Sequence, residues 1–287
     1  MTTFPGNRVI SSLNCGGRLL ALDPPVVMGI LNLTPDSFYD GGKFTQDSEI
    51  RARVEKMLAE GASIIDIGGV STRPGAAAVP PETEWERIKP ALSGLRRQFP
   101  EAFFSVDTTS AVVAEKAIDL GADLINDVSG GDGDPAMFEV ISRKKAPYIL
   151  MHMQGTPATM QKSPEYKDVT SEVLSSLISR AKRLQSMGAN DILLDPGFGF
   201  GKTTEHNYQL LGDLNLFKAS GFPVLVGFSR KSMINRVLGT TPENALNGTT
   251  VLNTIALIKG ASILRVHDVK EAHEAIKLVS QMKSSYR

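Results

Sequence analysis

Residues 102–127, AFFSVDTTSAVVAEKAIDLGADLIND, contain one complete strand–helix–strand unit. The runs AFFSVD (102–107) and DLIND (123–127) are almost continuously apolar, which is typical of strands buried in a parallel sheet. Between them, SAVVAEKAIDLG (110–121) has the spacing of an amphipathic helix and ends on glycine, a residue typical of helix C-termini. The stretch therefore predicts two strands joined by a helix.

The same unit recurs along the whole chain, and six more apolar runs bring the number of predicted strands to eight. These runs are 26–31 (VVMGIL), 63–68 (SIIDIG), 147–152 (PYILMH), 191–196 (DILLDP), 223–229 (PVLVGFS) and 262–267 (SILRVH). Further helices are predicted over 48–61, 83–99, 171–188 and 269–284, and Gly61, Gly121, Gly188 and Gly260 each stand just before a strand. Eight such units predict an α/β fold, a (β/α)8 TIM barrel, with a doubly wound open sheet as the main alternative.

The N-terminal segment 8–22, RVISSLNCGGRLLAL, interrupts this pattern. It predicts two short strands joined at Gly16-Gly17, a hairpin that we expect to close the bottom of the barrel. No low-complexity linker divides the chain, so we expect a single domain over residues 1–287.

The composition excludes several classes of protein. Thirty-one basic residues balance 31 acidic ones, which argues against binding to bulk nucleic acid or to a membrane surface. No run reaches the about 18 apolar residues of a spanning helix, and the start, MTTFPGNRV, resembles neither a secretory nor an organellar leader. The one cysteine, Cys15, excludes a disulfide framework. We therefore expect a cytoplasmic protein.

Barrel enzymes carry their chemistry at the carboxyl ends of the strands. Loops are polar in any case, but Asp66, Asn126 and Arg265 lie inside apolar runs, where an unpaired polar group would be costly. A ring of polar groups is thus predicted around one end of the barrel. The first polar residues leaving the strands are Asn32, Asp66, Asp107, Asn126 with Asp127, His152, Asp195, Ser229 with Arg230 and Lys231, and Arg265 with His267.

Four loops at this end have distinctive compositions. The segments 31–44 (LNLTPDSFYDGGKF) and 68–76 (GGVSTRPGA) are rich in turn residues and either close over a ligand or form ordinary connections. The segment 195–203 (DPGFGFGKT) resembles a phosphate loop only loosely, because it lacks the spacing of the known motifs. In 227–239 (GFSRKSMINRVLG), two cations at a helix start favour an anion, and simple capping by Ser229 or Ser232 is the alternative.

Other kinds of active site are disfavoured. The four histidines, His152, His206, His267 and His273, do not pair at the spacing of metal ligands. No GxSxG motif is present, which argues against a serine nucleophile. Arg265 and His267 alternate around Val266 and therefore project to one side, where the arginine fork suits a phosphate.

Taken together, these strings resemble dihydropteroate synthase. MGILNLTPDSFYDGG and IIDIGGVSTRPGA resemble the two signature segments of that family, and SVDT, INDVSG, LMHMQGTPATMQ, LLDPGFGFGKT, LVGFSRKSM and ILRVHDVKE follow in the family's order. The resemblance covers roughly residues 10–280. It implies condensation of 6-hydroxymethyl-7,8-dihydropterin pyrophosphate with p-aminobenzoate, giving 7,8-dihydropteroate and pyrophosphate.

The resemblance also implies roles for individual residues. Asp195 and Asn126 pair with the pterin ring nitrogens, Asp107 lies under the ring, and Lys231 donates to its oxygen and N5. Capping of the following loops is the alternative role of the two aspartates. Asn32, Arg265 and His267 hold the pyrophosphate together with Mg²⁺, and Asn32 is the one protein ligand expected for the metal.

p-Aminobenzoate needs an apolar slot for its ring and donors for its carboxylate. By resemblance the slot is formed by Phe38, Pro74 and Phe200, and the carboxylate meets Ser232. Asp40, Thr72 and Arg73 on the two loops complete this subsite. Phe38 and Pro74 alternatively only pack their loops. Sulfonamides are expected to compete in this slot, and the resemblance implies a homodimer built through the late helices.

Three other functions stay open at this point. The first is a pterin-binding methyltransferase module, and the second is an inactive pterin-binding protein. The third is a barrel lyase that forms a Schiff base through Lys231. Asp66 and His152 are expected to support the site rather than to contact ligand.

Overall fold

The structure, a computed structural model, describes residues 11–34, 43–71, 79–156, 159–160 and 164–285. Eight parallel strands form one sheet, in the order β8-β7-β6-β5-β4-β3-β10-β9. A parallel bridge between Leu194 of β8 and Val224, just before β9, joins the two ends of the sheet and closes the barrel. The predicted TIM barrel is therefore confirmed. The strands are β3 (Val26–Asn32), β4 (Ala62–Gly68), β5 (Phe103–Asp107), β6 (Leu124–Asp127), β7 (Tyr148–Met151), β8 (Ile192–Asp195), β9 (Leu225–Val226) and β10 (Ile263–Val266).

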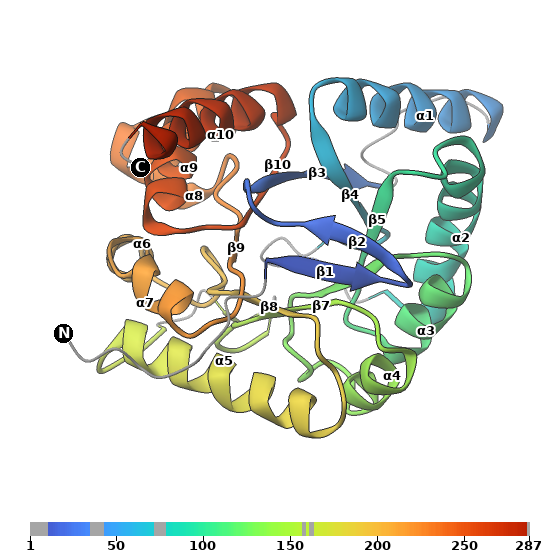
Figure 1. The fold of residues 1–287 in the computed structure, drawn as a ribbon, viewed down its shortest axis with the longest axis horizontal. Helices are drawn as coiled ribbons and strands as arrows, with labels where there is room; N and C mark the ends of the chain where they lie inside the picture. Colours follow the sequence, from blue (N-terminus) through green and yellow to red (C-terminus); the bar gives the residue numbers. More distant parts are fainter. Residues whose placement is uncertain (1–10, 35–42, 72–78, 157–158, 161–163, 286–287) are drawn as a thin grey trace.

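Helices surround this barrel, as Figure 1 shows in the view along it. All five predicted helices are present, and Gly61, Gly121, Gly188 and Gly260 adopt the positive φ angles expected after helix ends. A short 3₁₀ turn, Pro242–Asn244, precedes α9. The helices are α1 (Lys43–Ala59), α2 (Pro81–Gln98), α3 (Ala111–Asp119), α4 (Met137–Lys144), α5 (Val169–Ser186), α6 (Thr204–Gly212), α7 (Leu214–Ala219), α8 (Ser232–Leu238), α9 (Leu246–Lys259) and α10 (Val269–Ser284).

One predicted strand is much shorter than expected. The run 223–229 forms a ladder only over Leu225–Val226, because the chain turns after it. The amide of Lys231 donates to the carbonyl of Phe228, and Arg230 between them has a φ of 59°. This turn ends the strand early.

The alternation of strand residues creates two apolar cores. Outward-facing residues, such as Ile65, Val106 and Ile125, pack against the surrounding helices. Inward-facing residues, such as Met28 and Ile64, form a smaller core inside the barrel. Because this inner core fills the barrel at the amino ends of the strands, only the other end is left for polar groups.

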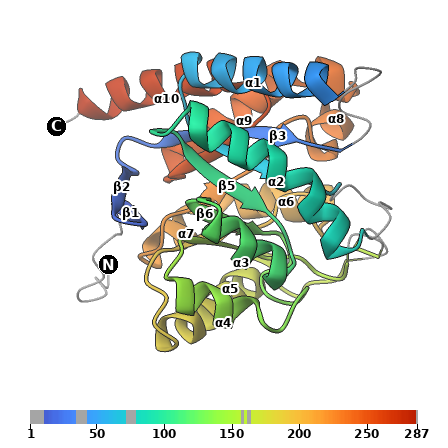
Figure 2. The same cartoon turned by 90° about the vertical axis from the view of Figure 1, so that its right-hand side faces the viewer.

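An antiparallel hairpin covers the amino ends of the strands. β1 (Ser12–Cys15) and β2 (Arg18–Ala21) are joined by Gly16 and Gly17, both at positive φ, as the sequence predicts. Leu13, Cys15, Leu20 and Leu22 belong to the inner core, so the hairpin closes the bottom of the barrel. Figure 2 places it at one end of the molecule.

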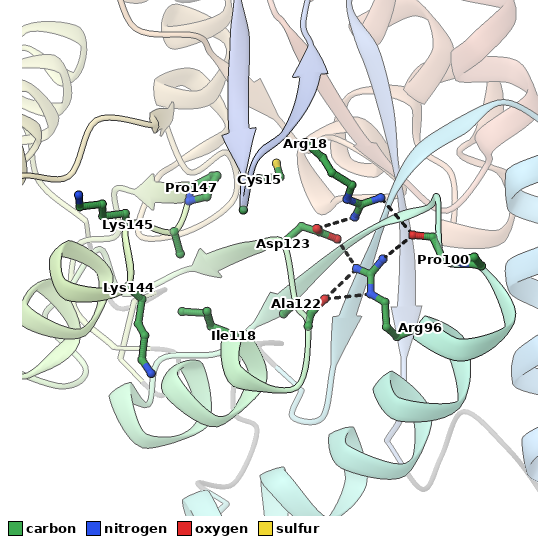
Figure 3. A pocket seen from close by; sticks show the side chains of 13 residues that line it. Cys15, Arg18, Arg96, Pro100, Ile118, Ala122, Asp123, Lys144, Lys145 and Pro147 are labelled. Atoms are coloured by element: carbon green, nitrogen blue, oxygen red, sulfur yellow. Dashed lines mark hydrogen bonds and ion pairs between the residues drawn. The ribbon is translucent and has the colours of Figure 1, made fainter.

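Beneath the hairpin, Asp123 holds two arginines (Figure 3). Its carboxylate accepts from Arg18 over 2.6 Å and from Arg96. Both guanidinium groups also donate to the carbonyls of Pro100 and Ala102, so this cluster ties the hairpin to the loops below the barrel. It borders a cavity of about 360 Å³. Within the described ranges, no helix is both long and apolar enough to cross a membrane.

Candidate active site

The strand register brings the predicted polar residues together at the carboxyl ends of the strands. Asn32 pairs in register with Gly68, Gly68 with Asp107, and Asp107 with Asn126. Gly68 leaves room between its neighbours, since a Cβ there would lie 3.5 Å from Oδ1 of Asn32 and 3.7 Å from Cβ of Asp107. Four adjacent strands thus present one continuous polar surface.

Arg265 is the centre of a buried ionic network in this surface. Its Nε donates to Oδ2 of Asp66 and its Nη2 to Oδ2 of Asp107, both over 2.7 Å. Nδ2 of Asn126 donates to the same Asp66 oxygen over 3.0 Å. Asp66 is fully buried, which is a supporting position, whereas Arg265 is partly exposed. Its contacts with described residues use only Nε and Nη2, which leaves the third guanidinium nitrogen, Nη1, for an anion.

Asp195 and Lys231 form a second group, arranged by the loop 196–203. The amide of Gly197 donates to Oδ1 of Asp195 over 2.7 Å, so this carboxylate does cap the loop that follows it. Nζ of Lys231 donates to the carbonyl of Phe198 over 2.5 Å and lies 4.6 Å from the centre of the Phe200 ring. The loop therefore fixes both charged groups and presents an aromatic face beside them.

His267 is held by Ser229, a residue of the predicted polar ring for which capping was the alternative role. Oγ of Ser229 lies 2.9 Å from Nδ1 of His267 and also accepts from its backbone amide over 3.3 Å. Neither Ser229 nor Ser232 caps α8, whose N-cap is Lys231 without a side-chain bond. The hydroxyl of Ser229 instead orients the imidazole.

Two residues of the predicted ring at the carboxyl end of the barrel, here called the mouth, are held by partners outside the Arg265 network. Arg230 makes a two-point ion pair with Asp268, with distances of 3.1 and 2.7 Å, so its charge is balanced within the protein. Asp127 follows the inward-facing Asn126 and therefore points outward. There its carboxylate accepts from the amide and hydroxyl of Ser129 and from the hydroxyl of Tyr148.

Burial shifts the proton affinity of the groups at the mouth. It raises the pKa of Asp107 and of Asp195 above the usual range, against the opposing charges of Arg265 and Lys231 respectively. Burial lowers the pKa of Lys231 to about 8, against the attraction of Asp195. It also lowers the pKa of His267 to about 4, an effect that Arg265 reinforces, so this imidazole is neutral at pH 7. Such shifts are typical of functional sites.

The remaining predicted residues divide into two sets. Phe200 lies beside Lys231, and the side chain of Ser232 is exposed at the start of α8. The p-aminobenzoate residues Phe38, Asp40, Thr72, Arg73 and Pro74 lie outside the described residues. His152, at the end of β7, contacts Lys202 through Nδ1 over 3.2 Å. The sequence did not predict the burial of Lys202. It only marked the segment DPGFGFGKT, which contains this lysine, as a distinctive loop.

This geometry suits a ligand with both a polar heterocycle and an anionic group. A buried carboxylate and amide can read the donor and acceptor edge of a ring, and the lysine can meet a ring oxygen. An arginine and a neutral imidazole stand nearby for a phosphate. The described residues contain no cluster of three His, Cys, Asp or Glu side chains that could hold a metal.

Comparison with known proteins agrees with this arrangement. A family profile described as "Pterin binding enzyme" matches residues 28–267. The dihydropteroate synthase of Haemophilus influenzae is 44% identical over 93% of this chain and 97% of its own length. The crystal structure of the Yersinia pestis dihydropteroate synthase with a sulfonamide drug complex has a TM-score of 0.89 and 42% identity, covering 95% of this chain and 99% of that one. The Xanthomonas albilineans enzyme with 4-aminobenzoic acid has a TM-score of 0.88 and 40% identity, covering 95% and 98%.

Proposed function

The chain belongs to the dihydropteroate synthase family, and on that premise we propose how its barrel mouth performs the family's reaction. The enzyme joins 6-hydroxymethyl-7,8-dihydropterin pyrophosphate to p-aminobenzoate through a new C–N bond. The observation that carries the assignment of the site is the convergence of Asp107, Asn126, Asp195, Lys231 and Arg265 at the carboxyl ends of the strands. The reaction needs a pterin reader and an anion holder side by side, and these residues supply both.

The pterin ring would lie between the two charged groups. Asp195 accepts from the exocyclic amine and the adjacent ring N–H, while Asn126 pairs with the other ring nitrogens. Asp107 lies under the ring, and Lys231 donates to the ring oxygen and N5. The buried position of Asp107 and Asp195 supports these roles, because a low local dielectric strengthens each hydrogen bond.

The pyrophosphate would lie at Arg265, His267 and Asn32. We infer an ionisation-first route. The bond between the methylene carbon and the pyrophosphate oxygen breaks, and the electron pair leaves with the phosphate. The p-aminobenzoate nitrogen then bonds to the methylene carbon and loses a proton. These donors, the charged Arg265 among them, are fixed in place and stabilise the departing anion, which is where we expect most of the rate enhancement.

We propose that a magnesium ion binds at this end of the barrel with few protein ligands. Asn32 would hold the ion through its amide oxygen, which lies beside Asp107 at the ends of β3 and β5. When bound, Mg²⁺ would neutralise charge on the leaving pyrophosphate.

p-Aminobenzoate would stack near Phe200, with its carboxylate at the exposed hydroxyl of Ser232. Phe38, Asp40, Thr72, Arg73 and Pro74 complete this subsite by resemblance. We propose that sulfonamides compete here. If a variant altered at Phe38 or Pro74 kept unchanged sensitivity to sulfonamides, that would count against this slot.

We further propose a homodimer formed through the late helices. The helix α9 packs against both α8 and α10 (Figure 1). Several large apolar side chains of these helices are exposed, which supports an interface there. Sedimentation of the intact protein would test it. The exposed residues are Val237, Leu238, Val251, Ile258 and Leu278. The cytoplasmic location stays a prediction.

The deciding experiment measures pyrophosphate release from the dihydropterin pyrophosphate, with Mg²⁺, in the presence and absence of p-aminobenzoate. We expect Mg²⁺-dependent release and dihydropteroate when both substrates are present. Slow release without p-aminobenzoate would support ionisation before attack. Pterin binding with no release under any condition would remove the transferase assignment.

A further inference from the structure

Lys202 is a buried cation that none of the roles above uses. Only 3% of it is exposed, and it lies in the largely buried loop between β8 and α6. Its Nζ lies 2.9 Å from the carbonyl of Phe200, 3.0 Å from that of Gly197 and 3.1 Å from that of His152. An ammonium group has three N–H donors, so these three carbonyls can use all of them. We therefore do not expect Lys202 to touch a substrate.

The carbonyls that Lys202 binds belong to two different loops. Gly197 and Phe200 lie in the loop 196–203, whereas His152 follows β7. The loops are in close contact, since a Cβ on Gly197 would lie 1.9 Å from the carbonyl oxygen of His152. The ammonium thus ties the loop after β8 to the end of the neighbouring strand.

The loop segment from Gly197 to Phe200, whose two end carbonyls bind Lys202, makes the contacts that orient Asp195 and Lys231. The amide of Gly197 donates to Asp195, and the carbonyl of Phe198 accepts from Lys231. The Phe200 ring faces the same Lys231 ammonium. Each contact lies within three residues of an atom that Lys202 holds.

We propose that Lys202 is a positioning residue for pterin binding, because its ammonium fixes the loop that orients Asp195 and Lys231. The inference rests on the proposed pterin site. Burying a charge carries a desolvation cost, which the three backbone carbonyls offset here. Burial also lowers the pKa of Lys202 to about 7, which agrees with such a cost.

The test compares Lys202→Met with Lys283→Met. Lys283 also donates to a backbone carbonyl, that of Leu257 over 2.7 Å, but it lies in α10 away from the mouth. The probe is 6-hydroxymethylpterin, which lacks the leaving group, and its affinity is measured by calorimetry alongside kcat and KM. We expect Lys202→Met to weaken pterin binding by about tenfold or more, as misplaced site groups do. Lys283→Met should bind like the wild type.

Hydrogen exchange of residues 196–203 supplies the second readout. It should accelerate in Lys202→Met and remain unchanged in Lys283→Met. If Lys202→Met does not fold, Lys202→Gln keeps two N–H donors and should show a smaller loss of pterin affinity with the same direction of exchange. A folded Lys202 variant with wild-type pterin affinity would overturn the inference while leaving the site assignment intact. Failure of the wild type itself to bind the pterin would instead overturn the proposed site.

Discussion

The Nε of Arg265 donates to the carboxylate of Asp66 over 2.7 Å, and that carboxylate is fully buried. The pair joins residues 199 positions apart, so it links the first half of the barrel to its last strand. Because Arg265 also reaches Asp107, its guanidinium is held from two sides and cannot rotate freely. Asp66 thereby fixes the position of the Arg265 guanidinium, the group that we expect to bind the anion.

We predict that Asp66→Asn lowers the free energy of unfolding by about 2 kcal/mol, since it weakens a hydrogen bond to a charged group. It should also lower kcat for pyrophosphate release, because Arg265 is then pulled towards Asp107. Urea unfolding and steady-state kinetics measure the two effects. Asp127→Asn is the matched control, because Asp127 on β6 is equally buried but faces outward. An equal loss of kcat in both variants would contradict the role of Asp66.

Gly197→Ala should damage the site through the backbone. Gly197 has a φ of 71°, and its added Cβ would clash with the carbonyl of His152, so the loop must move. The strained conformation alone costs about 1–3 kcal/mol. We expect a larger loss of stability and weaker pterin binding, because Asp195 and Lys231 depend on this loop.

Gly188→Ala separates the effect of backbone strain from the effect of the steric clash that Gly197→Ala also introduces. Gly188 also has a positive φ, 97°, but nothing lies within 4 Å of its added Cβ. It should therefore lose stability by about 1–3 kcal/mol without a change in pterin affinity. Thermal unfolding and calorimetry compare the two. Equal effects of both substitutions on binding would contradict the importance of the loop after β8.

The barrel and much of its polar mouth could be predicted because each apolar run gives the place of a strand in the sequence. The alternation within the run also gives the side of the sheet that each side chain faces. Asp66 and Arg265 stand inside apolar runs, and a single period of two places them on the inner side. The same rule explains the outward-facing Asp127, because it directly follows the inward Asn126. The facing of each residue at the strand ends could thus be predicted from its position in the run.

What the sequence could not reveal depends on tertiary turns. Arg230, which pairs with Asp268, has a positive φ angle that no local sequence pattern indicates. Lys202 is drawn inward by carbonyls of two loops, and carbonyl positions are not encoded in residue type. The early end of β9 has a similar cause, since Phe228 and Lys231 close a turn at its end.

The ionic cluster beneath the hairpin should matter for stability and not for catalysis. Asp123 is 8% exposed and pairs with Arg18 and Arg96 at the end opposite the mouth. Asp123→Asn should lower the free energy of unfolding by about 3 kcal/mol, the lower end of the range for a broken buried pair, with kcat and KM unchanged. Glu115→Gln, which weakens an exposed ion pair with Arg143, should cost less than about 1 kcal/mol. Altered kinetics in folded Asp123→Asn would show that the hairpin end communicates with the mouth.

The titration of Lys231 should move stability and pterin binding in opposite directions. Burial lowers its pKa from 10.5 to about 8 in the folded protein. Between these pH values the unfolded chain holds more protons than the folded one, so this group makes the free energy of unfolding rise with pH. Pterin affinity should fall as the pH rises through about 8, because a neutral amine is a weaker donor to the ring oxygen. Calorimetry with 6-hydroxymethylpterin and urea unfolding from pH 7 to 10 measure both trends. Lys231→Met serves as the reference, since the other titrating groups, Lys202 included, remain in it. If wild type and Lys231→Met showed the same pH dependence of binding, Lys231 would not be the donor to the pterin.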